Sequence, residues 1–187
     1  MDGRDSESSV QLSSEQLYSV LYHPQYLVSD MAEKAKPAKV SLARVTIDAP
    51  PSKVYEKLAD VQSWNDWHKS AWVLRAPGLD KLKPGEKFSY TAPFVLGNVC
   101  SEVTEASPNQ ALEWSDSALF GLINGGHRWR LQGKGRRLLG LIGKQQTQVV
   151  LDQEVTGFGQ LLVSGKGLEK HAATWLTELK QSVEGAK

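Results

Sequence analysis

A carboxylate and an imidazole on neighbouring segments are the strongest chemical signal in the sequence. Asp116 precedes and His127 follows a short loop between two segments of alternating apolar and polar residues. A carboxylate beside an imidazole fixes the imidazole tautomer, and the pair can move a proton near neutral pH. Ser101 lies one hairpin earlier, but Asp116 would then separate it from His127, whereas a catalytic triad joins serine to histidine directly. The residues therefore indicate an acid–base pair rather than a triad.

The pairing of these residues follows from two expected hairpins. With a tight turn centred on Pro108–Asn109, Ser101 opposes Asp116. With the next loop centred between Gly121 and Leu122, Asp116 opposes His127. Apolar residues then oppose apolar residues in both hairpins, and a slip of one residue would reverse every face. The row expected on the concave face is Ser101, Asp116, His127 and Gln153.

Two interpretations of the Asp116–His127 pair stay open. The pair is either a structural contact at a pocket rim, because ion pairs shift pKa values without catalysis, or it binds and protonates a ligand. Tyr90 is either a half-buried structural residue or a hydroxyl that assists the pair. The residues predicted to be catalytic are His127, Asp116 and Tyr90.

The elements that must position these residues begin with a strand, since residues 39–48 alternate apolar and polar side chains. Pro50 and Pro51 then favour the first turn of a helix. Further strands are expected at 70–75, 86–92, 94–106, 110–117, 126–133 and 146–156, followed by one long helix at 159–184. Runs of strands followed by a helix indicate an α+β fold with an antiparallel sheet.

Three local motifs resemble the START/polyketide-cyclase (SRPBCC) superfamily, which is also known from the Bet v 1 pollen allergen. VTIDAPPSKVYEKLADVQSWNDWH resembles its opening strand and helix, LEWSD followed by GGHRWRLQ resembles a central hairpin, and LDQEVTGFGQLL resembles the passage into the last helix. The resemblance covers residues 39–184. It implies a helix-grip fold, in which a curved antiparallel sheet wraps around a long C-terminal helix and encloses an apolar cavity. Members include lipid-transfer proteins, ligand carriers and aromatase/cyclases, without a shared catalytic motif.

A cavity is also supported by small residues that thin the final helix, at Gly165, Gly167, Ala172 and Ala173. The residues predicted to bind a ligand are Phe88, Ser101, Val103, Trp114, Trp129, Leu131, Gln153, Leu168, His171, Ala172 and Trp175. The opposite face of the sheet is expected to carry a solvent-facing charge ladder. Its members are Glu102, Glu113, Arg128, Arg130, Asp152 and Glu154.

Length and composition exclude several classes of function. The 187 residues fit one domain at 39–187 with a partly helical or disordered extension at 1–38. The 22 Lys and Arg balance 21 Asp and Glu, which argues against a nucleic-acid binder. One cysteine excludes an internal disulfide, and neither a metal motif nor a glycine-rich phosphate loop is present, so no metal or cofactor is expected. Without a signal peptide or a membrane span, a cytoplasmic protein is expected.

Three functions remain open on the sequence. The first is binding of a hydrophobic or aromatic small molecule, and the second is a cofactor-free cyclase, dehydratase or isomerase that acts on a natural-product-like substrate. The third is a lipid carrier that touches membranes through residues 136–142, where arginines and apolar residues mix. An extended hairpin is the preferred interpretation of that segment, because its helical moment is poor. A homodimer through residues 1–38 also stays open.

Overall fold

The computed structural model describes residues 39–69, 71–75, 82–92, 95, 97–138 and 141–185. For residues 39, 136–138, 141–144 and 161–162 the description is of the backbone alone. The predicted extension at 1–38 lies outside the described residues.

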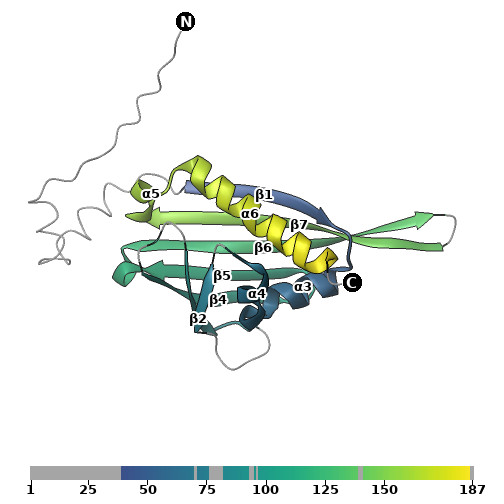
Figure 1. The fold of residues 1–187 in the computed structure, drawn as a ribbon, viewed down its shortest axis with the longest axis horizontal. Helices are drawn as coiled ribbons and strands as arrows, with labels where there is room; N and C mark the ends of the chain where they lie inside the picture. The colour runs from purple at the N-terminus through teal and green to yellow at the C-terminus, as the bar shows by residue number, and fades with distance from the viewer. Residues whose placement is uncertain are drawn as a thin grey trace, which may run out of the picture. The chain divides into compact units, whose positions relative to one another are not determined.

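Seven strands form one antiparallel sheet in the order β1-β7-β6-β5-β4-β3-β2. The strands are β1 (Lys39–Ile47), β2 (Trp72–Arg75), β3 (Lys87–Thr91), β4 (Asn98–Ser107), β5 (Ala111–Ala118), β6 (Ile123–Leu138) and β7 (Leu141–Gly157). Strands β2 to β7 follow one another in the sheet as they do in the sequence, whereas β1 pairs with the last strand (Figure 1). The predicted α+β helix-grip fold is confirmed.

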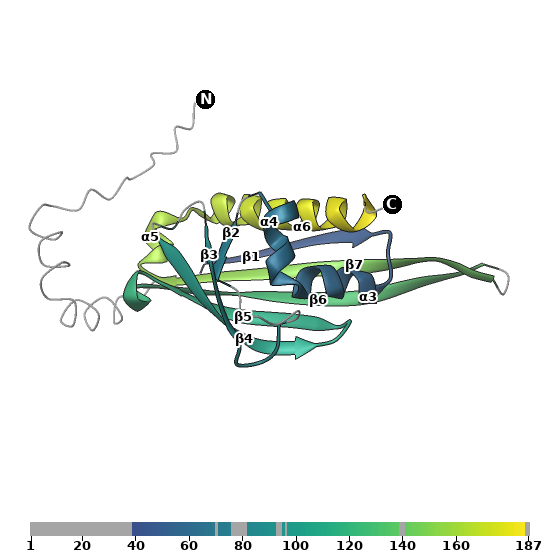
Figure 2. The same cartoon turned by 60° about the horizontal axis from the view of Figure 1, so that its bottom comes forward.

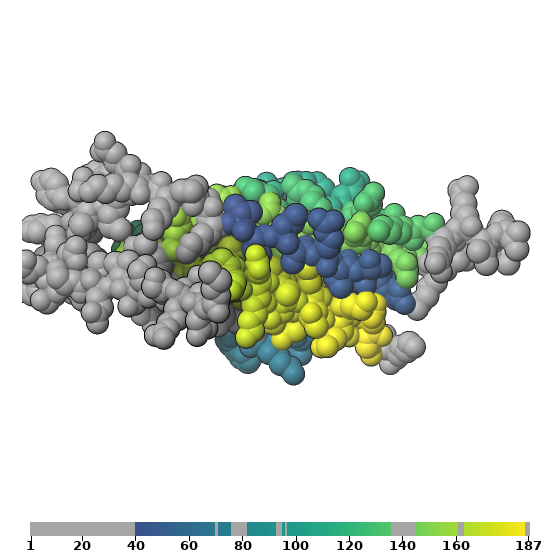
Figure 3. Space-filling model, turned by 90° about the horizontal axis from the view of Figure 1, so that it is seen from above, coloured from purple at the N-terminus to yellow at the C-terminus, as the bar shows by residue number. Residues whose placement is uncertain are grey.

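The helices lie on one face of the sheet (Figure 2). They are α3 (Pro51–Ala59), η1 (Val61–Ser63), α4 (Trp64–Trp67), α5 (Gly159–Leu162) and α6 (Gly165–Glu184). A further short helix, η2 (Leu119–Gly121), forms the turn between β5 and β6. Helix α6 crosses the sheet and runs beside β1, as the yellow and blue surfaces of Figure 3 show. The face between α6 and the sheet holds the core.

Helix α3 begins and packs as its sequence indicates. Pro50 is extended at φ −67° and ψ 155°, and Pro51 occupies the first helical turn, where a missing N–H costs nothing. The predicted apolar face is buried, with Val54 and Leu58 fully removed from solvent. This helix closes the face at the end of the sheet where the chain leaves β1.

The prediction of one helix from 159 to 184 is wrong, because the chain breaks before α6. Ser164 is extended at φ −74° and ψ 154°, and its Oγ accepts a hydrogen bond from the N–H of Gly167 at 3.0 Å. A serine that caps the first turn satisfies an N–H that the helix itself leaves unpaired. The 20 residues of α6 extend about 30 Å at 1.5 Å per residue, enough to cross the sheet.

The first hairpin has the predicted register near the site, with Ser101 opposite Asp116. The second hairpin differs by two positions, since Asp116 opposes Gly125 rather than His127. The physical reason is the turn η2, in which Phe120 adopts a left-handed conformation at φ 57° and moves the turn centre toward β5. A shift of two residues keeps every side chain on its predicted face.

The segment around residues 136–142 is an extended hairpin in its described part, residues 133–138 and 141–144, which confirms the preferred interpretation. Strand β6 continues to Leu138, which pairs with Leu141 of β7. The pairing of β6 with β5 ends at Arg130, and that of β7 with β1 ends at Thr147. Among the described strands, the end of this hairpin therefore pairs only with itself (Figure 1).

Aromatic side chains fill the centre of the core. The rings of Trp64 and Trp175 lie 5.1 Å apart edge to face, and those of Trp129 and Trp175 lie 5.7 Å apart. Phe88 packs against Trp114 at 5.7 Å. Such contacts are the preferred geometry of aromatic rings and stabilise beyond the burial of their area. The middle of the helix–sheet space is consequently solid.

Candidate functional site

A pocket remains at the end of the core where β5 turns into β6 and where α5 joins α6. Its volume is about 50 Å³. Its apolar walls include Val99, Ala118, Ile123, Val155 and Leu168. Its polar lining includes Tyr90, Asp116, Gln153, His127 and His171. The titratable residues that the sequence singled out thus share one small, mainly apolar space.

Asp116 connects two neighbouring side chains at this pocket. Its Oδ1 accepts a hydrogen bond from Ser101 Oγ at 2.5 Å, and its Oδ2 accepts one from His127 Nδ1 at 2.7 Å. The side chains of Asp116 and His127 are 11% and 9% exposed, so water weakens the contact little. With Nδ1 donating to the carboxylate, His127 Nε2 is the nitrogen that can exchange a proton with a guest.

The absence of a side chain at Gly125 allows the diagonal contact between Asp116 and His127 to form. Gly125 opposes Asp116 directly and offers no side chain, so the carboxylate reaches the next inward residue of β6. A Cβ on Gly125 would lie 2.5 Å from the backbone oxygen of Glu154, which is too close for a real contact. Trp114 stacks on the His127 ring at 5.0 Å and an interplanar angle of 21°, and this limits rotation of the imidazole.

Gln153 and His171 form a second polar pair in the same pocket. Gln153 Nε2 donates a hydrogen bond to His171 Nδ1 at 3.2 Å, which assigns the His171 proton to Nε2. Burial, together with the charges that His127 and His68 carry when protonated, lowers the pKa of His171 to about 3. His171 is therefore a neutral hydrogen-bonding group at physiological pH.

Tyr90 from β3 contributes a neutral phenol. Burial raises its pKa well above the usual value near 10, and the negative charge of Asp116 acts in the same direction. The side chain is 2% exposed and stacks on Phe88 with ring centroids 6.0 Å apart. Tyr90 can therefore donate a hydrogen bond but does not act as a base.

A contact between His68 and Glu178, next to the core residue Trp175, was not predicted. His68 is hydrogen-bonded through Nδ1 to Glu178 of α6. The His68 ring also stacks on Trp175 with centroids 3.5 Å apart. Burial lowers the pKa of His68, although Glu178 opposes that effect.

The residues predicted to bind a ligand divide into two groups. Gln153, Leu168 and His171 line the pocket together with Tyr90, Asp116 and His127. The others do not line this pocket: Val103, Trp114, Trp129, Leu131, Ala172 and Trp175 lie in the packed core or behind it, and Phe88 and Ser101 line a separate, more open groove of about 680 Å³ that Asp116 also borders. Of the small residues expected to thin the final helix, Gly165 and Ala173 are exposed and only Ala172 is buried. The free space instead adjoins small residues at Ala92, Ala118, Gly125 and Gly159, which sequence reasoning missed.

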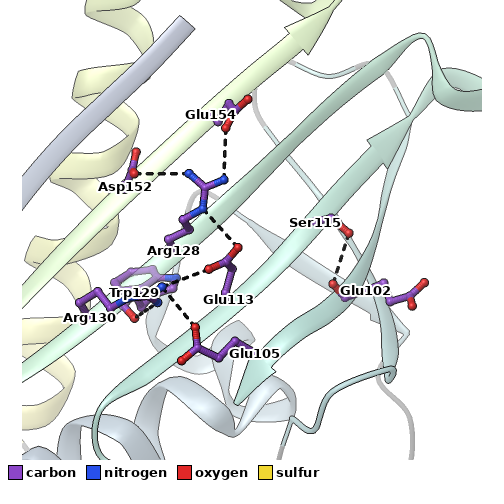
Figure 4. A network of polar contacts seen from close by, with 9 residues as sticks. All are labelled: Glu102, Glu105, Glu113, Ser115, Arg128, Trp129, Arg130, Asp152 and Glu154. Atoms are coloured by element: carbon purple, nitrogen blue, oxygen red, sulfur yellow. Dashed lines mark hydrogen bonds and ion pairs between the residues drawn. The ribbon is translucent and has the colours of Figure 1, made fainter. Parts of the chain in front are cut away.

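The outer face of the sheet carries the predicted charge ladder. Arg128 contacts Glu113 at 3.2 Å, Glu154 at 3.4 Å and Asp152 at 3.6 Å (Figure 4). Arg130 bridges Glu105 and Glu113, each at 3.2 Å. Glu113, by hydrogen bond and charge, raises the pKa of Arg128. Because the two arginines point outward while Trp129 is fully buried, the predicted strand parity is confirmed.

The described ranges hold neither a metal-binding cluster nor a membrane-spanning helix. No cluster of three His, Cys, Asp or Glu side chains there has a geometry that could hold a metal ion. No helix in the same part of the chain is long and apolar enough to cross a membrane.

Comparison with known proteins identifies relatives of the whole described domain. The family model described as "Polyketide cyclase / dehydrase and lipid transport" matches residues 38–184. A search of curated protein sequences finds no significant match.

Solved structures share the fold at low sequence identity. The Mesorhizobium loti protein MLL2253 is 18% identical with a TM-score of 0.57, over 79% of this chain and 98% of its own. The Helicobacter pylori hypothetical protein jhp0584 is 16% identical with a TM-score of 0.59, over 77% and 87%. Norcoclaurine synthase from Thalictrum flavum, solved with dopamine and hydroxybenzaldehyde, is 9% identical with a TM-score of 0.57, over 84% and 92%.

Proposed function

Because the chain belongs to the polyketide cyclase/dehydrase and lipid transport family, we propose that it binds a hydrophobic or aromatic small molecule in the pocket and acts on it through His127 and Asp116. The observation that carries the proposal is the 2.7 Å contact between His127 Nδ1 and Asp116 Oδ2. This contact leaves the second imidazole nitrogen for a guest in a mainly apolar space. Pockets of this kind, apolar with a few convergent polar groups, are the usual sites of ligand binding.

The proposed chemistry is a proton transfer that needs no redox partner. His127 Nε2 takes a proton from a carbon or hydroxyl of the guest, and the resulting imidazolium is stabilised by Asp116. The same nitrogen then returns the proton to another atom of the guest. Return to carbon gives an isomerisation, whereas return to a departing hydroxyl releases water and completes a dehydration. A cyclisation follows if the carbanion attacks a carbonyl within the guest before the proton returns.

Tyr90 supports this chemistry as a hydrogen-bond donor. A buried phenol with a strongly raised pKa stays protonated while the guest develops negative charge. Fixed donors that face a developing oxyanion stabilise it without reorganisation. The aromatic guests of norcoclaurine synthase, which shares this fold, support an aromatic guest here.

A ligand carrier would use the same pocket without proton transfer. Pockets that enclose drug-sized ligands measure about 300–1,000 Å³. The volume of about 50 Å³ therefore favours a small guest, or the end of a longer one, over a whole lipid.

Native mass spectrometry of the freshly purified protein tests the proposal by detecting a retained small molecule. Titration with 2-naphthol and indole, followed by backbone amide NMR, should shift the signals of Gly125, His127 and Leu168. Ala118→Phe should fill the pocket and remove these shifts. Ser115→Phe, on the exposed face of the same strand, should keep them. Shifts confined to other surfaces, or equal shifts in both variants, would contradict the proposal.

A further inference from the structure

Two residues of the pocket lining, His127 and Gln153, lie side by side and each carries an acceptor atom. His127 of β6 and Gln153 of β7 are directly opposed in the sheet. Both side chains are turned to the helix-covered face, with total exposures of 7% and 1%, and both line the pocket. Directly opposed residues hold their Cβ atoms about 4.5–5.5 Å apart. A single small group in the pocket is therefore within reach of both.

The hydrogen bonds that His127 and Gln153 make to other residues determine which of their polar atoms are left to accept a hydrogen bond. His127 Nδ1 donates to Asp116, so Nε2 of the neutral ring carries a lone pair. Gln153 Nε2 donates to His171, so the carbonyl oxygen Oε1 is the amide atom that remains able to accept a hydrogen bond. Neither His127 Nε2 nor Gln153 Oε1 has a hydrogen-bond partner among the described residues, and both atoms are buried. Buried polar atoms are nearly always paired in folded proteins, so this arrangement anticipates a donor from outside the chain.

The charges around the pocket have one sign. Of the residues that line it, Asp116 is acidic and turns inward, whereas the Glu154 carboxylate contacts Arg128 on the outer face; no lysine or arginine is among the described lining residues. The nearest arginine in the sequence, Arg128, points to the outer face, where it contacts acidic side chains. A carboxylate placed between these two acceptors would therefore face them and the negative charge of Asp116, and the neutral Tyr90 phenol, although a donor, would not compensate its charge.

We infer that the pocket selects guests whose polar end donates hydrogen bonds, such as an alcohol, an amine or a primary amide, and that it rejects carboxylates. The inference rests on the proposed function, because it names the class of guest that the same pocket takes. An alcohol gives one donor to His127 or Gln153, and a primary amide or an amine gives a donor to each. The apolar body of the guest then lies against Ile123, Val155 and Leu168.

The test compares four probes with the same narrow apolar chain: hexan-1-ol, hexanamide, methyl hexanoate and hexanoate. Backbone amide NMR titrations at pH 8 report the dissociation constant of each from the pocket signals. We expect the alcohol and the amide to bind at least about tenfold more tightly than hexanoate, the effect of about one hydrogen bond. The neutral ester has acceptors only and should rank with hexanoate.

Variants on one strand assign the selectivity to the acceptors. Gln153→Leu should reduce the preference for hexanamide over methyl hexanoate by about tenfold. Gln148→Leu makes the same change on the outward-facing side of β7 and should leave the preference intact. Gln153→Glu keeps a polar side chain and should increase the preference for hexylamine, which provides a second readout if the leucine variant does not fold.

The outcomes separate this inference from the proposed function. If all four probes bind with equal affinity, the pocket binds guests but does not select donors, and the inference is wrong. Tight binding of hexanoate would overturn it as well. If no probe, including 2-naphthol, shifts a pocket signal, both the proposed function and the inference fail.

Discussion

The imidazole of His127 and the carboxylate of Asp116 meet diagonally across β5 and β6, with Nδ1 and Oδ2 2.7 Å apart. Asp116 directly opposes Gly125, and Trp114 directly opposes His127. The contact therefore depends on three features at once: a residue without a side chain opposite the acid, an aromatic ring that holds the imidazole, and a turn that sets the register.

Substitution of the acid–base pair should distinguish an enzyme from a carrier. In an enzyme, His127→Ala should lower turnover by about 10² or more, the usual effect of losing a positioned acid or base. Asp116→Asn should lower it similarly or less, since it changes the tautomer and charge of the histidine. In a carrier, both variants should change ligand affinity by at most about tenfold.

The control for this experiment is Asp152→Asn, which makes the same change on the outer face of the sheet. It should leave turnover and affinity unchanged. Full turnover in both pocket variants would exclude the proposed proton transfer.

Gly125→Ala should destabilise the protein by about 1–3 kcal/mol, because the added methyl group must displace backbone. Its Cβ would lie 2.5 Å from the Glu154 oxygen. Gly135→Ala is the matched control on the same strand, since no atom lies within 4 Å of the corresponding position. Urea unfolding of both variants measures the difference, and equal midpoints would show that the strands adjust without cost.

Trp129→Ala should lower the free energy of unfolding by about 3–5 kcal/mol, as expected for a large aromatic side chain in a packed core. Trp129 is fully buried and does not line the pocket. Arg130→Ala, at the next position on the outer face, removes half-exposed ion pairs and should cost less than about 1 kcal/mol. Chemical denaturation provides both values; a loss below about 1 kcal/mol for Trp129 would indicate a loosely filled core.

Acid should destabilise the protein through His171. Its pKa is about 3 in the folded protein and near 6.5 when unfolded. The unfolded chain therefore binds the proton first as the pH falls, and stability is lost between about pH 6.5 and 3 by about 1.4 kcal/mol per pH unit. The lowered pKa of His68 acts in the same direction. Stability of His171→Gln, measured by urea unfolding across this range, should depend less on pH than that of the native sequence; parallel pH profiles would refute the assignment.

Patterns with a short period in the sequence predicted the fold well. The apolar face of α3 and the outward arginines of β6 followed from helical spacing and strand alternation. The break at Ser164 was missed, because a serine among helix-compatible residues caps a helix only if the chain before it turns away. The register of the second hairpin was missed because it depends on left-handed backbone conformations at Leu119 and Phe120. Residues other than glycine rarely adopt such conformations.

The side chains that share a face of the candidate site were predictable, whereas the extent of the pocket was less so. Alternation alone put Asp116, His127 and Gln153 on one face, and the two-residue shift preserved that face. Which apolar residues leave space could not be predicted, because this depends on how the tryptophan rings fit together in three dimensions. The His68–Glu178 contact joins residues far apart in the sequence, and no local pattern indicates it.

The pairing of the first strand with the last sets the order in which the domain can be completed during synthesis. Ile47 pairs with Thr147, and Lys39 pairs with Val155, whereas each strand from β2 to β6 pairs with the next strand along the chain. A ribosome adds about 5–20 residues per second, so β1 waits on the order of ten seconds for β7, its partner among the described strands. During that time its apolar side chains are exposed to other chains and to chaperones. We therefore expect nascent chains that end before residue 147 to be sensitive to proteases at β1, and chains that extend past α6 to become resistant in one step.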